Sequence, residues 1–333
     1  MGGGGSYYDR DVTATYLTTN AKGYSDDAER VLGQNKMDPG LLPKGWWLEC
    51  VAKNPLVYCF DITGSMGTLP KIIWDKWPGI VGQVAARRYL PDPEMSIAAV
   101  GDIRSDSSPL QVCNFDSLRN LDRWMKRIHF EKGGGGQGSE SYEMMAYYYL
   151  HYFKMPNAEL PMYFMTGDEA CVEDLHARDL REQFGGNHEN TTAKAVFRAL
   201  LDKFHGNVFR IQRPYHGHGT EGWDNDKIVA QWERLLGRER VIYLPDDRAI
   251  GDVTLGLYAI VSGATTLTQY LVDMRERPLD LAEGMKFEPQ SLERVQQVAK
   301  ALAGFADYKP FRSHRRTGTR DKADESSRQA RTA

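Results

Sequence analysis

Short apolar runs alternate with stretches of helical periodicity along most of this chain. Strands are predicted at 55–60, 95–100, 110–115, 161–166, 207–213 and 240–244, and helices at 71–90, 118–130, 140–153, 193–204, 228–236, 250–261, 267–275 and 291–308. Strands that alternate with helices form βαβ units. The pattern therefore predicts an α/β fold with a mainly parallel central sheet and helices on both faces. Turn-forming residues at 105–109 indicate one antiparallel edge strand.

Composition divides the chain into three parts. Residues 1–45 are polar and rich in turn formers, which predicts an irregular N-terminal arm with one short helix near 26–32. Residues 46–308 contain the alternating elements without a clear linker, and we expect a single α/β domain that ends in helices. Residues 309–333 carry eight Lys or Arg against three Asp or Glu, which predicts a basic, disordered tail. Met1–Ser6 reads equally well as native sequence or as a linker.

Charge and cysteine content narrow the functional class. The whole chain carries −3, so the balance of +5 in the tail leaves −8 on the remainder, and nothing global indicates nucleic acid. The four cysteines show no C-x-x-C spacing, which favours a reducing cytoplasm. No apolar run approaches the roughly 18 residues that a membrane span needs, and the N-terminus lacks the pattern of a signal peptide. We therefore expect a cytoplasmic protein without a membrane partner.

The loop after the first apolar strand carries three oxygen-bearing side chains at alternate positions. Asp61, Thr63 and Ser65 stand at i, i+2 and i+4. Alternate residues of an extended turn point the same way, so one ion can bind all three. Mg²⁺ prefers about six oxygen ligands in an octahedron at roughly 2.1 Å. The alternative interpretation is a helix N-cap, in which the same side chains bind backbone amides.

Two later loops carry further oxygen donors. A glycine run at 133–136 leads into Ser139 and Ser141 at the start of a predicted helix, although a plain loop with a serine cap has the same sequence. Asp168 follows the strand predicted at 161–166, at the same sheet edge as Asp61. A divalent cation would relieve the repulsion between these two carboxylates. The alternative role for Asp168 is again a helix cap.

Together the three loops resemble the metal-ion-dependent adhesion site (MIDAS) of von Willebrand factor A (vWA) domains. That family has D-x-S-x-S after its first strand, a threonine in a glycine-containing second loop and an aspartate after a later strand. Asp61, Thr63 and Ser65 match the first element, with threonine replacing the first serine. Ser141 is the preferred counterpart of the threonine and Ser139 its rival. Asp168 matches the third element, although the order here is Thr-Gly-Asp where many members have Thr-Asp-Gly.

The resemblance covers roughly residues 54–265 and is nearest to intracellular bacterial vWA proteins with an Asp-x-Thr-Gly-Ser-Met loop. It implies a Rossmann-like vWA fold with one Mg²⁺, or Mn²⁺ or Ca²⁺ in its place. The implied ligands are Asp61, Thr63, Ser65, Ser141 and Asp168. In this family the protein leaves the metal incompletely coordinated, and a water or a carboxylate from a protein partner completes the shell. The resemblance thus implies an adaptor or scaffold without catalytic residues or an organic cofactor.

Two other functions compete with this interpretation. A metal-dependent hydrolase using the same acidic edge would need a general base, for which Glu169 and His216 are the only candidates. A structural protein with a degenerate site would bind no metal. The chain contains neither a Walker A loop nor a G-x-S-x-G elbow, and the glycines at 133, 135 and 138 do not follow the first strand as dinucleotide binding requires.

Overall fold

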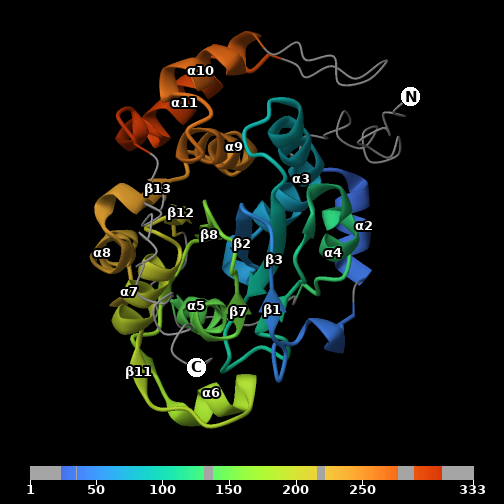
Figure 1. Ribbon diagram of the computed structural model, residues 1–333, viewed down its shortest axis with the longest axis vertical. Coiled ribbons are helices and arrows are strands. Elements are labelled where there is room, and N and C mark those ends of the chain that lie inside the picture. The colour runs from blue at the N-terminus through green and yellow to red at the C-terminus, as the bar shows by residue number, and fades with distance from the viewer. Residues whose placement is uncertain (1–23, 35, 131–137, 216–221, 277–288, 310–333) are drawn as a thin grey trace, which may run out of the picture.

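The computed structural model describes residues 24–34, 36–130, 138–215, 222–276 and 289–309. Most of the predicted N-terminal arm, the glycine run, His216 and all but the first residue of the predicted tail lie outside these ranges. Within them, a seven-stranded sheet has the order β13–β12–β8–β2–β3–β4, and β5 also pairs with β3 (Figure 1). Its strands are β2 (Pro55–Asp61), β3 (Glu94–Val100), β4 (Leu110–Val112), β5 (Asp116–Ser117), β8 (Met162–Gly167), β12 (Val208–Gln212) and β13 (Val241–Tyr243).

Helices cover both faces of this sheet. One face packs against α2 (Asp26–Gln34), α3 (Leu69–Ala86), α4 (Leu121–Met125), α9 (Ile250–Val261), α10 (Leu267–Glu276) and α11 (Leu292–Ala301). The other packs against α5 (Tyr142–His151), α6 (Ala177–Phe184), α7 (Ala193–Lys203) and α8 (Asn225–Leu236). The two layers stand on either side of the central strands in Figure 1.

Short elements complete the described chain. Three two-stranded pairs join β1 (Leu48–Glu49) to β7 (Phe153–Lys154), β6 (Ser139–Glu140) to β9 (Ala170–Cys171), and β10 (Asp174–Leu175) to β11 (Thr191–Thr192). The 3₁₀ turns are η1 (Pro39–Leu41), η2 (Gly64–Met66), η3 (Leu118–Asn120), η5 (Arg238–Arg240), η6 (Asp247–Ala249) and η7 (Ala303–Phe305).

The central strand β2 shows why its sequence is continuously apolar. All seven of its residues are buried. Leu56, Tyr58 and Phe60 enter the core on the α3 and α9 side of the sheet. Val57 and Cys59 enter the core on the α5 and α7 side. A strand covered on both faces has no side exposed to solvent, so it lacks the polar alternation of a half-exposed strand.

The predicted fold class is confirmed. Strands β13, β12, β8, β2 and β3 run parallel, whereas β4 and β5 pair with β3 in the antiparallel sense. The short helix expected near 26–32 is α2, which packs on α3, and the Ser25 hydroxyl donates to Asp75 Oδ1 at 2.6 Å. The helix predicted at 118–130 is shorter, because its first turn is η3 and α4 ends at Met125. None of the helices in the described ranges is both long and apolar enough to cross a membrane.

Candidate metal centre

The candidate centre lies where the central strands β2 and β8 end side by side. Asp61 is the last residue of β2, and Asp168 directly follows β8, with Phe60 opposite Thr166 in the register. The strand that follows β2 in the chain, β3, lies on its other side. Ligands in open α/β sheets bind at such a point, where neighbouring connections leave in opposite directions. The sheet order thus brings together the first and third predicted loops.

Hydrogen bonds link four of the predicted site residues into one continuous chain. Asp61 Oδ1 accepts from the Thr63 amide at 2.8 Å and from Thr63 Oγ1 at 2.6 Å. Thr63 Oγ1 lies 3.2 Å from Ser65 Oγ, which donates to Asp168 Oδ1 at 3.0 Å. Oxygens that surround Mg²⁺ octahedrally at roughly 2.1 Å are about 3.0 Å from their neighbours. The side-chain oxygens are therefore already spaced much as the ligands of one such ion would be.

The second loop contacts these hydrogen-bonded side chains through Tyr142, a residue that the sequence analysis did not predict to be part of the site. Ser141 Oγ accepts from the Ile103 amide at 3.0 Å, and the Ser141 amide donates to Gly101 O at 3.1 Å. These contacts join Ser141 to the loop after β3. The next residue, Tyr142, donates a hydrogen bond from its hydroxyl to Asp61 Oδ2. Tyr142 therefore ties the second loop to the carboxylate at the end of β2.

The absence of a side chain at Gly167 leaves room for the Tyr142 ring. A Cβ atom at Gly167 would lie 2.0 Å from the Tyr142 hydroxyl oxygen and 2.9 Å from Arg210 Nη2. Any other residue would displace the hydroxyl from Asp61. This close approach explains the Thr-Gly-Asp order, in which the glycine comes before the aspartate.

The buried guanidinium group of Arg210, in β12, packs against the Tyr142 ring. Arg210, in β12, is fully buried, and its guanidinium carbon lies 4.2 Å from the centre of the Tyr142 ring and 4.4 Å from that of Trp232. Its Nε donates to Gln212 Oε1 at 3.0 Å and its Nη2 to Glu169 O at 3.2 Å. Tyr142 and Trp232 also meet edge to face, with ring centres 5.4 Å apart. Cation–π contacts strengthen when they are desolvated, so this cluster of Arg210, Tyr142 and Trp232 holds the ring that reaches Asp61.

Four carboxyl groups share this buried edge. Burial raises the pKa of Asp61, although hydrogen bonds from Thr63 and Tyr142 oppose the shift. Burial and the charge of Asp61 raise the pKa of Asp168 to about 7. Burial and the charges of Asp61 and Asp168 raise that of Glu169 to about 8. Burial, followed by the charges of Asp61 and Glu169, raises the pKa of Glu140 to about 11. Each carboxylate makes its neighbours harder to ionise.

Basic side chains of the protein balance only part of the negative charge that these four carboxyl groups would carry when ionised. Arg213 Nη1 lies 3.4 Å from Asp168 Oδ2 and donates to Ser65 O at 3.0 Å, but Arg213 Nε pairs with Asp247 at 2.8 Å. Both oxygens of Glu140 and one of Glu169 are buried without a donor from the described residues. Unpartnered buried carboxylates beside hydroxyl and carboxylate oxygens fit a hard divalent cation.

Hydroxyl ligands are essential to such a site. Over the described parts of the chain, no three His, Cys, Asp or Glu side chains are grouped so that they could hold one metal ion. A cation at this edge would need Thr63 and Ser65 as well as carboxylates. A site of this kind has few formal charges in its inner shell, which suits an ion that keeps several waters.

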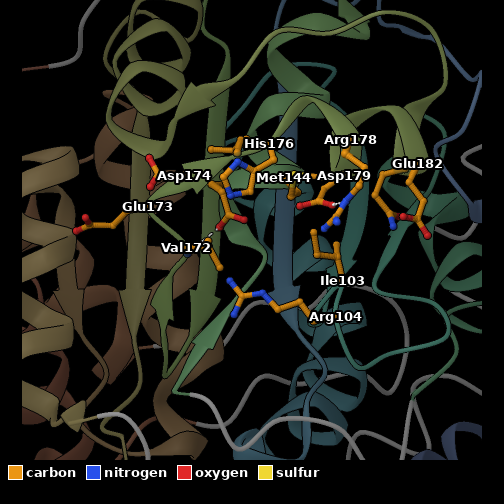
Figure 2. A pocket seen from close by; sticks show the side chains of 13 residues that line it. Ile103, Arg104, Met144, Val172, Glu173, Asp174, His176, Arg178, Asp179 and Glu182 are labelled. Carbon is orange, nitrogen blue, oxygen red and sulfur yellow. Dashed lines mark hydrogen bonds and ion pairs between the residues drawn. The ribbon is translucent and has the colours of Figure 1, made fainter.

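A cavity of about 550 Å³, lined by both apolar and charged side chains, lies beside the second and third loops (Figure 2). Its wall includes Ile103, whose amide binds Ser141, and Glu143, whose Oε2 accepts from the Val172 amide at 3.1 Å. Burial raises the pKa of Glu143 to about 8. Arg178 and Asp179 form an ion pair of 2.9 Å at its α6 side. The cavity thus offers a mixed-charge recess next to the candidate centre.

No protein-family model matches the chain, and no curated protein matches it by sequence. Several solved structures match part of the chain at low similarity. The pilus adhesin SpaC from Lactobacillus rhamnosus GG is 8% identical with a TM-score of 0.44, over 67% of this chain and 33% of the adhesin. A von Willebrand factor type A protein from Catenulispora acidiphila is 17% identical with a TM-score of 0.35, over 62% and 42%.

Proximal thread matrix protein 1 from the mussel byssus is 8% identical with a TM-score of 0.38, over 63% of this chain and 49% of that protein. The matched part of each of these structures is at most about half its length. At these values, the fold assignment depends on the sheet order and helix layers described above.

Proposed function

We propose that this chain is a vWA-type protein-binding domain with one Mg²⁺ at a MIDAS formed by Asp61, Thr63, Ser65 and Asp168, together with the second loop. The continuous chain of oxygens from Asp61 to Asp168, with 2.6–3.2 Å between hydrogen-bonded side-chain atoms, carries this proposal. Mn²⁺ or Ca²⁺ would occupy the same position, because both are also bound by oxygen ligands.

The ion would face solvent on the side of Ser65. Asp61 and Asp168 are fully buried and Thr63 nearly so, whereas Ser65 is half-buried and its neighbour Gly64 is exposed. Neutral hydroxyls donate less negative charge to a cation than carboxylates do. A carboxylate from a protein partner could therefore complete the shell at the exposed position. This arrangement supports a role as a metal-dependent adaptor or scaffold.

The state of the cysteines supports the expected cytoplasmic location. Cys50, Cys59, Cys113 and Cys171 are all buried as free thiols. Burial raises the pKa of Cys50 to about 12 and holds the other three thiol pKa values well above their ordinary range. Such thiols are unreactive structural groups, which accords with a reducing compartment.

Partner capture tests the binding function. The tagged full chain would be immobilised with Mg²⁺, with EDTA, and as the Asp61→Ala variant, and bound proteins would be compared. We expect a partner that is retained only by the wild type with Mg²⁺ and is displaced by a short glutamate-rich peptide but not by its glutamine counterpart. Retention that ignores EDTA and the substitution would contradict a metal-dependent mode of binding.

One observation favours a hydrolase as the second candidate. Glu169 lies beside Asp61 and Asp168, and its pKa of about 8 falls near the range of a general base. The other proposed base, His216, lies outside the described residues. Incubation with phosphoester and peptide panels would decide between the functions. Metal-dependent turnover that Asp61→Ala abolishes would favour the enzyme over the binding domain.

A further inference from the structure

Glu140 is the most unusual side chain near the candidate centre. It lies in β6, opposite Cys171 of β9, so the short pair β6–β9 holds it against the loop that carries Asp168 and Glu169. The side chain is 0% exposed, and neither of its oxygens accepts a hydrogen bond from any donor in the described residues. Native proteins rarely leave a buried carboxylate in this condition.

The charges nearest to Glu140 make its burial less favourable. After burial itself, Asp61 and Glu169 and then Asp102 and Asp106 raise its pKa, and all four are acidic. Of the two arginines of the site, Arg213 pairs with Asp168 and Asp247. Arg210 binds Gln212 and packs against two aromatic rings, and its Nη1 has no acceptor among the described residues. A cation would provide a positive charge, and a water bound to it would provide the hydrogen-bond donor that Glu140 lacks among the described residues.

Glu169, on the third loop, is likewise a buried glutamate with a carboxylate oxygen that lacks a hydrogen-bond donor. Its side chain is 3% exposed, and its Oε2 has no hydrogen-bond donor among the described residues. Burial and the charges of Asp61 and Asp168 raise the pKa of Glu169, and a side-chain hydrogen bond with Glu140 opposes this rise, so the two carboxyl groups are in contact. Two partly unsatisfied carboxylates from different loops therefore converge on the edge where Asp61 and Asp168 end their strands.

Ser141, in contrast, already has hydrogen-bond partners elsewhere. Its hydroxyl accepts from the Ile103 amide, and its own amide donates to Gly101 O. Both contacts stabilise the junction between the second loop and the loop after β3. The Ser141 hydroxyl oxygen would have to be shared between the Ile103 amide and a metal, whereas the Glu140 oxygens accept from no donor among the described residues.

We propose that Glu140, rather than Ser141, is the second-loop residue that serves the metal, and that Glu140 and Glu169 hold the ion by accepting hydrogen bonds from its bound waters. This inference rests on the proposed Mg²⁺ site. Water-mediated contact follows because no three carboxylates in the described ranges are grouped to share one ion directly. Mg²⁺ commonly keeps several waters, and those waters would donate hydrogen bonds to the Glu140 oxygens and to Glu169 Oε2, which accept from no donor among the described residues.

Metal titration of matched variants tests the assignment. Mn²⁺ would be titrated calorimetrically into the full chain as wild type, Glu140→Gln, Glu169→Gln, Ser141→Ala and Asp61→Ala. We expect Glu140→Gln and Glu169→Gln to weaken binding about 10- to 100-fold, as losses of outer metal contacts do. Ser141→Ala should change the affinity less than about threefold, well below that range.

Thermal unfolding supplies a readout that a purely structural role would not produce. Without metal, Glu140→Gln should leave the melting temperature close to that of the wild type at neutral pH, because the amide replaces a carboxyl that burial and its acidic surroundings keep neutral. With saturating Mg²⁺, the wild type should gain more in melting temperature than Glu140→Gln does. A merely structural glutamate would lower the melting temperature equally with and without Mg²⁺.

The possible outcomes separate this inference from the function on which it rests. If Glu140→Gln binds Mn²⁺ like the wild type while Asp61→Ala does not, the role of Glu140 is wrong and the Mg²⁺ site stands. If Asp61→Ala also binds like the wild type, the proposed site itself fails. A loss in Ser141→Ala as large as that in Glu140→Gln would return the second-loop role to Ser141. Should Glu140→Gln fail to fold, Glu169→Gln decides the same question.

Discussion

Tyr142 donates a hydrogen bond from its hydroxyl to the carboxylate of Asp61, and so joins the first residue of α5 to the last residue of β2. The two residues are 81 positions apart in the chain and both are fully buried. The bond holds Oδ2 of Asp61 in place while Oδ1 binds Thr63. Tyr142 is thus the residue that positions the central carboxylate of the candidate site.

Removal of the Tyr142 hydroxyl should destabilise the protein. We expect Tyr142→Phe to lower the free energy of unfolding by about 1.5–3 kcal/mol, the usual contribution of a hydrogen bond to a charged group. Urea denaturation of the wild type and Tyr142→Phe in EDTA measures this loss of unfolding free energy. Tyr243→Phe is the control, because that hydroxyl binds Glu233 at the surface and should matter far less. If the two substitutions lower the unfolding free energy equally, the hydrogen bond to Asp61 contributes no more to stability than an exposed one.

Gly167 should tolerate no side chain. Gly167→Ala places a methyl group 2.0 Å from the Tyr142 hydroxyl oxygen, so the ring must move away from Asp61. We expect a loss of about 1–3 kcal/mol in unfolding free energy, as for other overpacked sites, and weaker Mn²⁺ binding. Gly304→Ala is the control, since a Cβ there meets no atom within 4 Å. Wild-type stability in Gly167→Ala would disprove the close packing of Tyr142.

The metal-free protein should lose stability as pH rises. In the folded state the pKa of Asp168 is about 7 and that of Glu169 about 8, both above the ordinary values of 3.8 and 4.5 for these side chains. Between pH 4 and 8 the unfolded chain therefore ionises first and binds fewer protons than the folded chain, so unfolding becomes easier. One unit of pKa corresponds to about 1.4 kcal/mol.

Urea unfolding in EDTA at pH 5 and pH 8 measures this dependence. We expect a loss of more than about 1.4 kcal/mol, equivalent to one pKa unit. Saturating Mg²⁺ should shrink the loss, because the cation favours the ionised carboxylates that remain in the fold. A stability that is flat or rises over this interval without metal would show that the four carboxyl groups do not repel one another as described.

The fold was largely predictable because its signals are local. The double-sided burial of β2 leaves a continuous apolar run, and the long helices carry clear periodicity. The helix α6 was missed because it lies in a polar stretch where only Leu180 and Phe184 are buried. The paired short strands, such as β6 and β9, were missed because two residues are too few to show a period.

The candidate site was predictable only in part. Asp61, Thr63 and Ser65 lie close together in sequence, and Asp168 joins them because β8 pairs with β2. Tyr142 and Arg213 were not predicted, because their contacts depend on how three loops face one another across the sheet edge. The glycine of Thr-Gly-Asp was the one available signal, since an unusual order of residues marks a close approach. Glu140 could be recognised only from its burial.

Titration of Mn²⁺ into the wild-type chain and Asp61→Ala tests the central claim most directly. We predict one bound ion per wild-type chain and no detectable binding by Asp61→Ala, with circular dichroism unchanged because Asp61 is the last residue of β2 and the substitution leaves the strand pairing in place. Asp226→Ala, which removes an exposed carboxylate on α8, should bind like the wild type. Equal Mn²⁺ affinity in the wild type and Asp61→Ala would contradict the metal centre and the binding function built on it.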